Sequence, residues 1–112
     1  MVTFTVGSVV LIPFPFSDLS RSKLRPAIVI ASVEHDDWIL CQVTSQAYSD
    51  SQAIEISDDS FEQGSLHRIS YVRPGKIFTA HATLIRKTVG QLKPDVLKLI
   101  VLTIQNLIGK GI

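Results

Sequence analysis

Cysteine is almost absent from this chain of 112 residues. The single Cys41 cannot form a disulfide within the chain, which excludes a disulfide-stabilised scaffold and indicates a reducing, cytoplasmic setting. No apolar run approaches the roughly 20 residues that a membrane-spanning helix needs. No basic and then apolar leader precedes the first strand pattern. We therefore expect a soluble protein without a membrane partner.

Charge is also scarce, because 19% of the residues are charged and 46% are apolar. Lys and Arg are missing altogether from residues 26–67, a segment that holds most of the acidic side chains. Basic residues lie on both sides of that segment, although the net charge is only +1. The distribution is compatible with a surface of two signs, and equally with chance segregation in a small domain. The apolar excess suggests that some apolar surface meets a partner.

What is present fits one domain, residues 1–112. Short apolar runs separated by polar segments predict strands, and a single helical turn is expected in 58–66, ending at Gly64. The expected strands are 8–12, closed by Pro13 and Pro15, then 25–32 with Pro26 near its start, 38–45, 53–57, 67–72, 76–85 and 87–90. This pattern predicts a mainly β fold with a strongly curved antiparallel sheet or small barrel.

The last segment predicts a helix. Pro94 and Asp95 suit its first turn and Gly109 suits its C-terminal end. At 100° per residue, one face carries apolar side chains that we expect to pack on the sheet: Val96, Leu97, Ile100, Val101, Ile104, Leu107 and Ile108. Leu99 and Leu102 lie outside this face, where a second copy of the chain would cover them. The alternative is two ordinary exposed leucines.

The sequence offers little for metal or cofactor chemistry. His35, Asp36 and Asp37 are adjacent in an expected turn, where neighbouring side chains point apart, so a solvated turn is the better interpretation. His67 and His81 are isolated. No pattern resembles a phosphate-binding glycine loop, a nucleophile elbow or a zinc site. We expect no metal and no cofactor.

Arg25 is the most informative charged residue. Pro26 disfavours the helical region for the residue before it, so Arg25 is held extended at the entrance to an apolar strand. A guanidinium so directed is a good bidentate ligand for phosphate. A salt bridge to Asp18 or Glu34 explains the arginine equally well. Thr44 and Ser45 end a strand, where hydroxyls bind phosphate or simply begin a turn.

Several stretches, in this order along the chain, resemble the MazF/PemK family of toxins from type II toxin-antitoxin modules. They are GSVVLIPFPF, RPAIVIAS, QVTS, SYVRPGKIFT and LIRKTVGQL, followed by the C-terminal helix. The resemblance implies an SH3-like small barrel with a short helix and a C-terminal helix, as in CcdB and PemK, and a homodimer. It implies a metal-independent, sequence-selective endoribonuclease, or mRNA interferase, that cuts single-stranded RNA and inhibits growth. A cognate antitoxin would neutralise it, and the complex with antitoxin would bind operator DNA.

In that chemistry the 2′-hydroxyl of the RNA attacks the adjacent phosphate, so the enzyme supplies only proton transfer and charge stabilisation. By the resemblance, Arg25 would stabilise the phosphorane or protonate the leaving group, and Thr44 would bind the scissile phosphate. Ser70 and Arg73 match further positions near the family's active site. Further contacts to RNA are expected from polar residues near these positions in the sequence, namely Ser17, Asp18, Arg21, Lys23, Ser45 and Lys76.

Gly75 departs from the family pattern, because some members have an aspartate there that is proposed as general base. The general base is therefore unassigned. Four residues are candidates, namely Asp18, Ser70, His67 and His81, and the reaction can also proceed without one dedicated base. The segment 17–23 corresponds to a loop that borders the RNA groove and shifts when antitoxin binds. Phe14 and Phe16 are candidates for stacking on bases, and at least one is expected in the core.

Two other classes of function stay open. Gly75 is compatible with a barrel of the same fold that binds nucleic acid or a protein target without cutting it. The other class is a member of a toxin-antitoxin module that no longer cuts RNA and has only a structural role as a dimer.

Overall fold

The computed structural model describes residues 2–15, 22–46 and 50–112. Its strands are β1 (Ser8–Pro15), β2 (Ser22–Ser32), β3 (Asp37–Thr44), β4 (Ile54–Ile56), β5 (Phe61–Gly64), β6 (Ser70–His81) and β7 (Lys87–Leu92). Short 3-10 turns are η1 (Glu34–Asp36), η2 (Asp58–Ser60) and η3 (Ala82–Leu84), and the helix α1 spans Pro94–Gly109. The predictions of a mainly β fold, of a short turn in 58–66 and of a C-terminal helix are confirmed.

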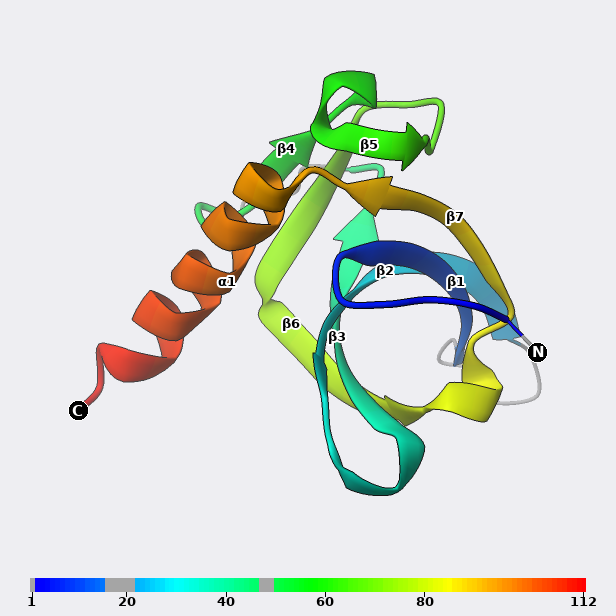
Figure 1. Ribbon diagram of the computed structural model, residues 1–112. Helices are drawn as coiled ribbons and strands as arrows, with labels where there is room; N and C mark the ends of the chain where they lie inside the picture. Colours follow the sequence, from blue (N-terminus) through cyan, green and yellow to red (C-terminus); the bar gives the residue numbers. More distant parts are fainter. Residues whose placement is uncertain (1, 16–21, 47–49) are drawn as a thin grey trace.

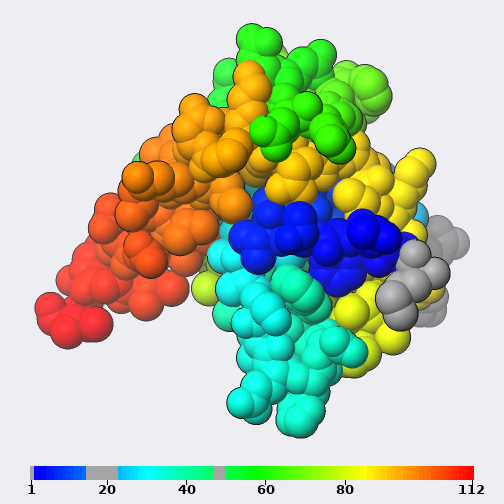
Figure 2. All heavy atoms as spheres, viewed as in Figure 1, coloured from blue at the N-terminus to red at the C-terminus, as the bar shows by residue number. Residues whose placement is uncertain are grey.

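The described strands form one antiparallel sheet in the order β4-β6-β3-β2-β1-β7-β5. The sheet curls strongly, so that its two edge strands β4 and β5 come to the same end of the molecule, where η2 joins them (Figure 1). The helix α1 lies along β6 outside the curl and carries the C-terminus away from it (Figures 1 and 2). This architecture is the expected small, strongly curved barrel-like sheet.

Two apolar cores lie on the two faces of this sheet. Alternation on β3 sends Cys41 and Val43 into one core, which α1 covers with Ile100 and Ile104, and sends Leu40 and Trp38 into the other. The second core also contains Val10, Ile12 and Ala27, with Phe14 and Phe78 packed against it. The central strands are therefore apolar on both sides, as the continuous run in β1 predicts.

The strand β1 continues through Pro13 and Pro15, which the sequence analysis placed at its end. Pro13 pairs with Leu24 and Pro15 with Ser22 on β2, whereas the pairing of β1 with β7 stops at Leu11. Beyond Leu11 the strand has a neighbour on one side only, and prolines are tolerated at such an edge. Pro26 likewise lies inside β2, one residue before its pairing with β3 begins at Ala27.

Two further predictions about elements were wrong. Residues 61–64, expected to continue a helical turn, form the edge strand β5, and Gly64 takes a positive φ of 71° beside β7. A Cβ at Gly64 would lie 2.2 Å from the Val89 carbonyl oxygen, so this close approach of two backbones requires glycine. The two strands expected at 67–72 and 76–85 are a single strand, β6, which ends at His81.

The helix α1 begins at Pro94, as predicted, and Ile100 and Ile104 are its buried residues. Leu99 and Leu102 are 53% and 45% exposed, on the side that the sequence analysis singled out. Ile108, which was expected to pack on the sheet, is 61% exposed because the last turn of α1 extends past β6 (Figure 1).

Truncating Ile100 to alanine is expected to lower the free energy of unfolding by about 2–5 kcal/mol, because it empties a fully buried position between α1 and the sheet. The measurement is chemical denaturation followed by circular dichroism. Lys98→Ala, at an exposed position two residues away, is the control and is expected to change stability by less than about 0.5 kcal/mol. Equal effects of the two changes would contradict this packing.

Candidate active-site groove

Arg25 and Thr44 lie on neighbouring strands and on the same side of the sheet. Arg25 pairs with Ile12 of β1, and Ala27, two residues further on, pairs with Gln42 of β3. Since alternate residues of a strand share a face, Arg25, Gln42 and Thr44 lie on one face, which we call the groove face. The expectation that Arg25 and Thr44 meet in space is consistent with this register.

Four cations line this face around an uncharged centre. Lys23 and Arg25 come from β2, and β3 runs between β2 and β6 with Gln42 and Thr44. On β6, Arg73 shares the face of Tyr71, which pairs with Thr44, and Lys76, beyond a shift in register, lines one hollow with Gln42. The two pairs belong to the basic segments that flank the acidic middle of the sequence. The sheet order therefore brings the two basic segments together across one strand, which gives a surface suited to a polyanion.

The salt bridge between Arg25 and Glu34 that the sequence left open does not form. Glu34 lies in η1 beyond the far end of β2, nine residues from Arg25, which corresponds to about 30 Å along an extended strand. Its carboxylate is 91% exposed and lies 3.9 Å from His35 Nε2. Asp18, the other partner considered, lies outside the described residues.

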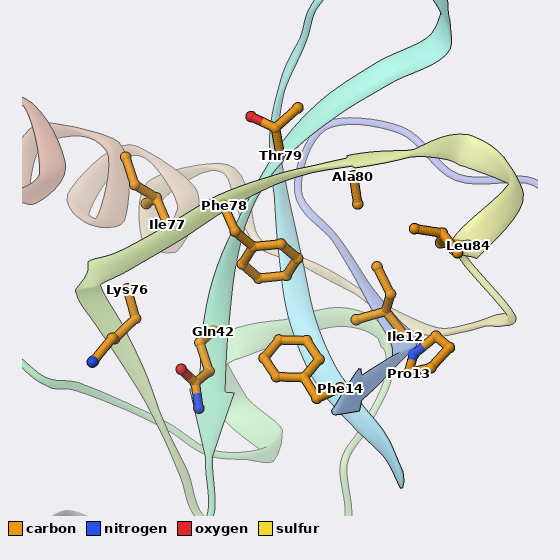
Figure 3. A pocket seen from close by; sticks show the side chains of 10 residues that line it. All are labelled: Ile12, Pro13, Phe14, Gln42, Lys76, Ile77, Phe78, Thr79, Ala80 and Leu84. Carbon is orange, nitrogen blue, oxygen red and sulfur yellow. The ribbon is translucent and has the colours of Figure 1, made fainter. Parts of the chain in front are cut away.

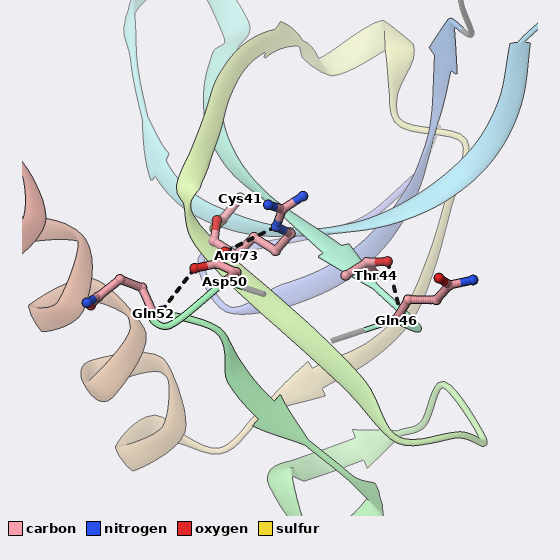
Figure 4. Close-up of polar contacts among 6 residues, drawn as sticks. All are labelled: Cys41, Thr44, Gln46, Asp50, Gln52 and Arg73. Carbon is pink, nitrogen blue, oxygen red and sulfur yellow. Dashed lines mark hydrogen bonds and ion pairs between the residues drawn. The ribbon is translucent and has the colours of Figure 1, made fainter. Parts of the chain in front are cut away.

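The Thr44 hydroxyl has a local structural contact. Thr44 is 8% exposed and its Oγ1 accepts a hydrogen bond from the Gln46 backbone N–H at 3.2 Å (Figure 4). This contact begins the turn after β3 and fixes the side chain on the groove face. Ser45 follows the strand and is exposed.

Arg73 is held by a residue that the sequence analysis did not single out. Its Nε donates to Asp50 Oδ2 at 3.1 Å, and the two side chains are only 22% and 16% exposed. Asp50 Oδ1 in turn accepts from the Gln52 backbone N–H at 2.9 Å (Figure 4). These two contacts, the Gln52 N–H first, hold the pKa of Asp50 below its usual value, so the carboxylate stays ionised.

The backbone at Arg73 is anchored from the core. Cys41 Sγ donates to the Arg73 carbonyl oxygen at 3.1 Å, and burial raises the pKa of the Cys41 thiol to about 12. Cys41 therefore acts as a neutral donor and not as a nucleophile. The pairing of β3 with β6 shifts register between Cys41 and Val43, so the segment from Arg73 to Lys76 bulges at this contact.

Ser70 is separated from the groove face. It pairs with Ile56 of β4 and is 2% exposed, while the next residue, Tyr71, pairs with Thr44. Its hydroxyl donates to the Arg68 carbonyl oxygen at 3.3 Å. The structure thus brings Arg25, Thr44, Arg73, Lys23 and Lys76 to one side of the sheet and directs Ser70 to the other.

The two histidines considered as bases are also remote from this arrangement. His81 ends β6 opposite Asp37, at the other end of β3 from Thr44, which is about 20 Å along the strand. His67 has a positive φ of 60° and lines a separate polar hollow with Asp58 and Asp59. Four residues named in the sequence analysis, Phe16, Ser17, Asp18 and Arg21, lie outside the described residues.

The described ranges hold no group of three or more His, Cys, Asp or Glu side chains placed to bind one metal ion. The adjacent His35, Asp36 and Asp37 form the end of η1 and the start of β3, and His35 and Asp36 both have a φ of 62°. Within the same ranges, α1 and the short turns are too short or too polar to cross a membrane.

Comparison with solved structures shows that this fold is shared with known toxins. A MazE-MazF complex from Deinococcus radiodurans contains a chain with 17% identity and a TM-score of 0.72, over 94% of this chain and 95% of that one. An endoribonuclease from a mycobacterial species matches with 15% identity and a TM-score of 0.70, over 97% and 94%. A mycobacterial endoribonuclease in complex with its cognate antitoxin also matches, with 15% identity and a TM-score of 0.68, over 97% of this chain and 96% of that one.

A search of curated protein sequences finds no match to this chain. Residues 5–108, by contrast, match the family described as PemK-like, MazF-like toxin of type II toxin-antitoxin system. That match includes every residue of the groove face named above and extends into the last turn of α1. The chain therefore belongs to the PemK-like, MazF-like toxin family of type II toxin-antitoxin systems.

Proposed function

We propose that this toxin is a sequence-selective endoribonuclease that cuts single-stranded RNA without a metal ion. The observation that carries the proposal is the groove face, where Arg25 and Thr44 lie on adjacent strands, with Lys23 beside Arg25 and with Arg73 and Lys76 on the other side of β3. Solved proteins with this fold include endoribonucleases. The face offers donors for phosphate oxygens, and the proposed chemistry requires no more than these and a route for protons.

In the proposed reaction the ribose 2′-oxygen attacks the adjacent phosphorus and loses its proton to solvent. The bond from phosphorus to the 5′-oxygen breaks, the 5′-oxygen takes up a proton, and the products are a 2′,3′-cyclic phosphate and a 5′-hydroxyl. Arg25 stabilises the charge on the equatorial oxygens, because its fork is always protonated and bonds two oxygens at once. Thr44 holds the scissile phosphate beside it.

The proposal assigns no side chain as general base. Ser70 lies on the opposite face of the sheet, and His67 and His81 lie away from Thr44. Asp18, the fourth candidate, lies outside the described residues. Gly75 is exposed, and a Cβ there would meet only Leu107 Cδ2, at 3.5 Å. That is an ordinary contact, so the fold does not demand glycine where other members have aspartate. Rate enhancement here rests on positioning and charge stabilisation by Arg25 and Arg73.

Asp50 is proposed as a positioning residue for Arg73. A guanidinium is planar, so the bond from Nε to Asp50 fixes the plane in which its N–H groups meet a phosphate. The lowered pKa of Asp50 makes it a weak proton acceptor, which argues for this role over that of a base. Because that pKa is lowered on folding, the contact stabilises at neutral pH and is lost only as the pH falls through it.

Replacing Asp50 with alanine is expected to lower kcat/KM for RNA by about 10-fold or more, since Arg73 loses the partner that orients it. Asp50→Asn keeps an acceptor oxygen and is expected to recover part of that loss. Steady-state cleavage of a fluorescent RNA gives kcat and KM separately, and Asp59→Ala, at an exposed carboxylate, is the control. If a fully folded Asp50→Ala protein cleaved RNA at the wild-type rate, Asp50 would have no positioning role for Arg73.

The protein is proposed to act as a homodimer that a cognate antitoxin neutralises, and the complex is proposed to bind operator DNA. Leu99 and Leu102 form an exposed apolar ridge on α1, which a second copy would cover. The antitoxin assignment rests on the family and on fold neighbours solved in complex with antitoxin. We also propose a cytoplasmic location, where both RNA and antitoxin are found.

The test is incubation of the purified protein with a mixed single-stranded RNA, followed by mapping of all fragment ends. The expected result is cutting at one short recurring sequence. Tight binding of RNA without fragments would instead support a non-catalytic binding protein of the same fold. If the protein neither cuts nor binds RNA, and its induction leaves growth unchanged, a purely structural role in the module is favoured.

A further inference from the structure

A hollow of about 380 Å³ opens on the groove face beside the proposed reaction site (Figure 3). It is lined by Ile12 and Phe14 of β1, by Gln42 of β3 and by Lys76 and Phe78 of β6. The lining is mostly apolar and aromatic, and the amide and the ammonium group supply its polarity. A mainly apolar hollow with a few polar groups is the usual form of a small-ligand site.

Two aromatic rings form one wall of this hollow. Phe14 and Phe78 contact each other edge to face, with centroids 5.0 Å apart and planes at 89°. In this arrangement each ring fixes the orientation of the other, and both side chains are half-buried. Figure 3 shows the rings side by side next to the Gln42 amide. Rigid aromatic surfaces of this kind bind the faces of unstacked nucleobases.

Gln42 supplies the polar group that a base edge requires. It lies near the C-terminal end of β3, half-buried, opposite the small side chain of Ala27. Within the described part of the chain its amide makes no hydrogen bond to another residue, and none of its atoms is sealed from solvent. A side-chain amide presents one acceptor and an adjacent donor, which can bond to the edge of a base.

The distance between the hollow and the proposed phosphate site fits the distance between a phosphate and the base of the same nucleotide. Gln42 is two residues before Thr44 on the same face of β3, or about 6.5 Å along the strand. A nucleotide whose phosphate contacts Arg25 and Thr44 therefore has its base within reach of Gln42. Lys76 lies beside Gln42 at the same side of the hollow (Figure 3), where its ammonium group is placed to meet a neighbouring phosphate.

We infer that this hollow is a nucleobase subsite, in which Phe14 and Phe78 hold one unstacked base and the Gln42 amide reads its edge. The inference rests on the proposed RNA cleavage and extends it, because it assigns part of the sequence selectivity to a named residue. Selectivity arises here because a base whose edge mismatches the amide leaves polar groups unpaired.

Gln42→Glu tests this assignment. The carboxylate only accepts hydrogen bonds, so the variant is expected to favour guanine, whose Watson–Crick edge presents two adjacent donors, at one position of the cleaved sequence. We expect the ratio of kcat/KM for guanine to that for the other bases at this position to rise by about 10-fold. The measurement is fragment-end mapping on a randomised RNA, with Gln63→Glu, at an exposed position on β5, as the control.

Phe14→Leu tests the stacking separately. It is expected to raise KM by about 10-fold while kcat changes by less than about threefold, since stacking holds the base before reaction. A wild-type protein that cuts, with Gln42→Glu cutting the same sequence or losing rate equally at all bases, would overturn the subsite and leave the proposed function intact. A wild-type protein that cuts nothing would overturn the proposed function and the subsite with it.

Discussion

Replacing Arg25 with alanine is expected to reduce cleavage of single-stranded RNA by about 10³-fold or more and to leave the fold intact. The side chain is half-buried on the groove face, opposite Ile12, and it is the strand residue that Pro26 holds extended. Removing it takes the fixed positive charge from the site where the phosphorane gains negative charge. The measurement is single-turnover cleavage of a defined RNA.

Two controls separate loss of chemistry from loss of structure. Arg25→Lys keeps the charge but loses the planar fork, so it is expected to retain more activity than alanine and less than wild type. Arg86→Ala removes an exposed arginine before β7 and is expected to cleave normally. Thermal unfolding of all three proteins should stay within a few degrees of wild type. Full activity in a folded Arg25→Ala protein would contradict the assignment.

Introducing glutamate at both Leu99 and Leu102 is expected to convert a dimer into a monomer, weakening self-association by about 100-fold or more. The two leucines are 53% and 45% exposed, one turn apart on α1, next to the face that packs on the sheet. Burying two carboxylates in an apolar contact without partners is strongly unfavourable. Sedimentation velocity over a range of concentrations measures the change.

Ser32→Glu with Gln63→Glu is the matched control, since both positions are exposed, lie away from α1 and add the same charge. This pair is expected to leave the mass of the dimer unchanged. A wild-type protein that sediments as a monomer at every concentration would end the proposal of a homodimer. If the double leucine variant remained a dimer, the contact would have to lie on another surface of the molecule.

Much of the fold could be predicted from periodicity and residue type. Alternation along β3 is one such signal: successive side chains point to opposite faces, and the structure places Cys41 and Val43 in one core and Leu40 in the other. The start of α1 at Pro94 followed from the fixed φ of proline. Local signals of this kind do not depend on distant parts of the chain.

The predicted strands and turns were wrong where contacts with residues distant in the sequence decide the local structure. Pro13 and Pro15 do not end β1, because β7 leaves that part of the strand unpaired on one side. The short β5 exists because Gly64 lets it approach β7 closely. Neither the strand order nor this contact is visible in a window of ten residues, where both prolines and the glycine have the form of signals that end an element.

The candidate site shows the same division. Local chemistry made Arg25 a candidate phosphate ligand, and the family resemblance added Thr44; the register places the two on one face. Asp50 could not be selected from the sequence, because it begins a turn 23 residues before Arg73 and only the fold brings the two side chains together. Gln42 is a single polar residue in an apolar strand, and its sequence neighbours do not indicate a binding role. Only the fold brings the rings of Phe14 and Phe78 beside it.

Cleavage by the 2′-hydroxyl of the RNA itself can be tested directly in one measurement. The wild-type protein is given a defined single-stranded RNA in excess chelator, next to the same RNA with a single 2′-deoxy substitution on the 5′ side of the mapped cut. We expect a 2′,3′-cyclic phosphate and a 5′-hydroxyl from the first RNA and no cut at that position in the second. Equal cutting of both RNAs, fragments with 3′-hydroxyl and 5′-phosphate ends, or loss of cutting on chelation would contradict this mechanism.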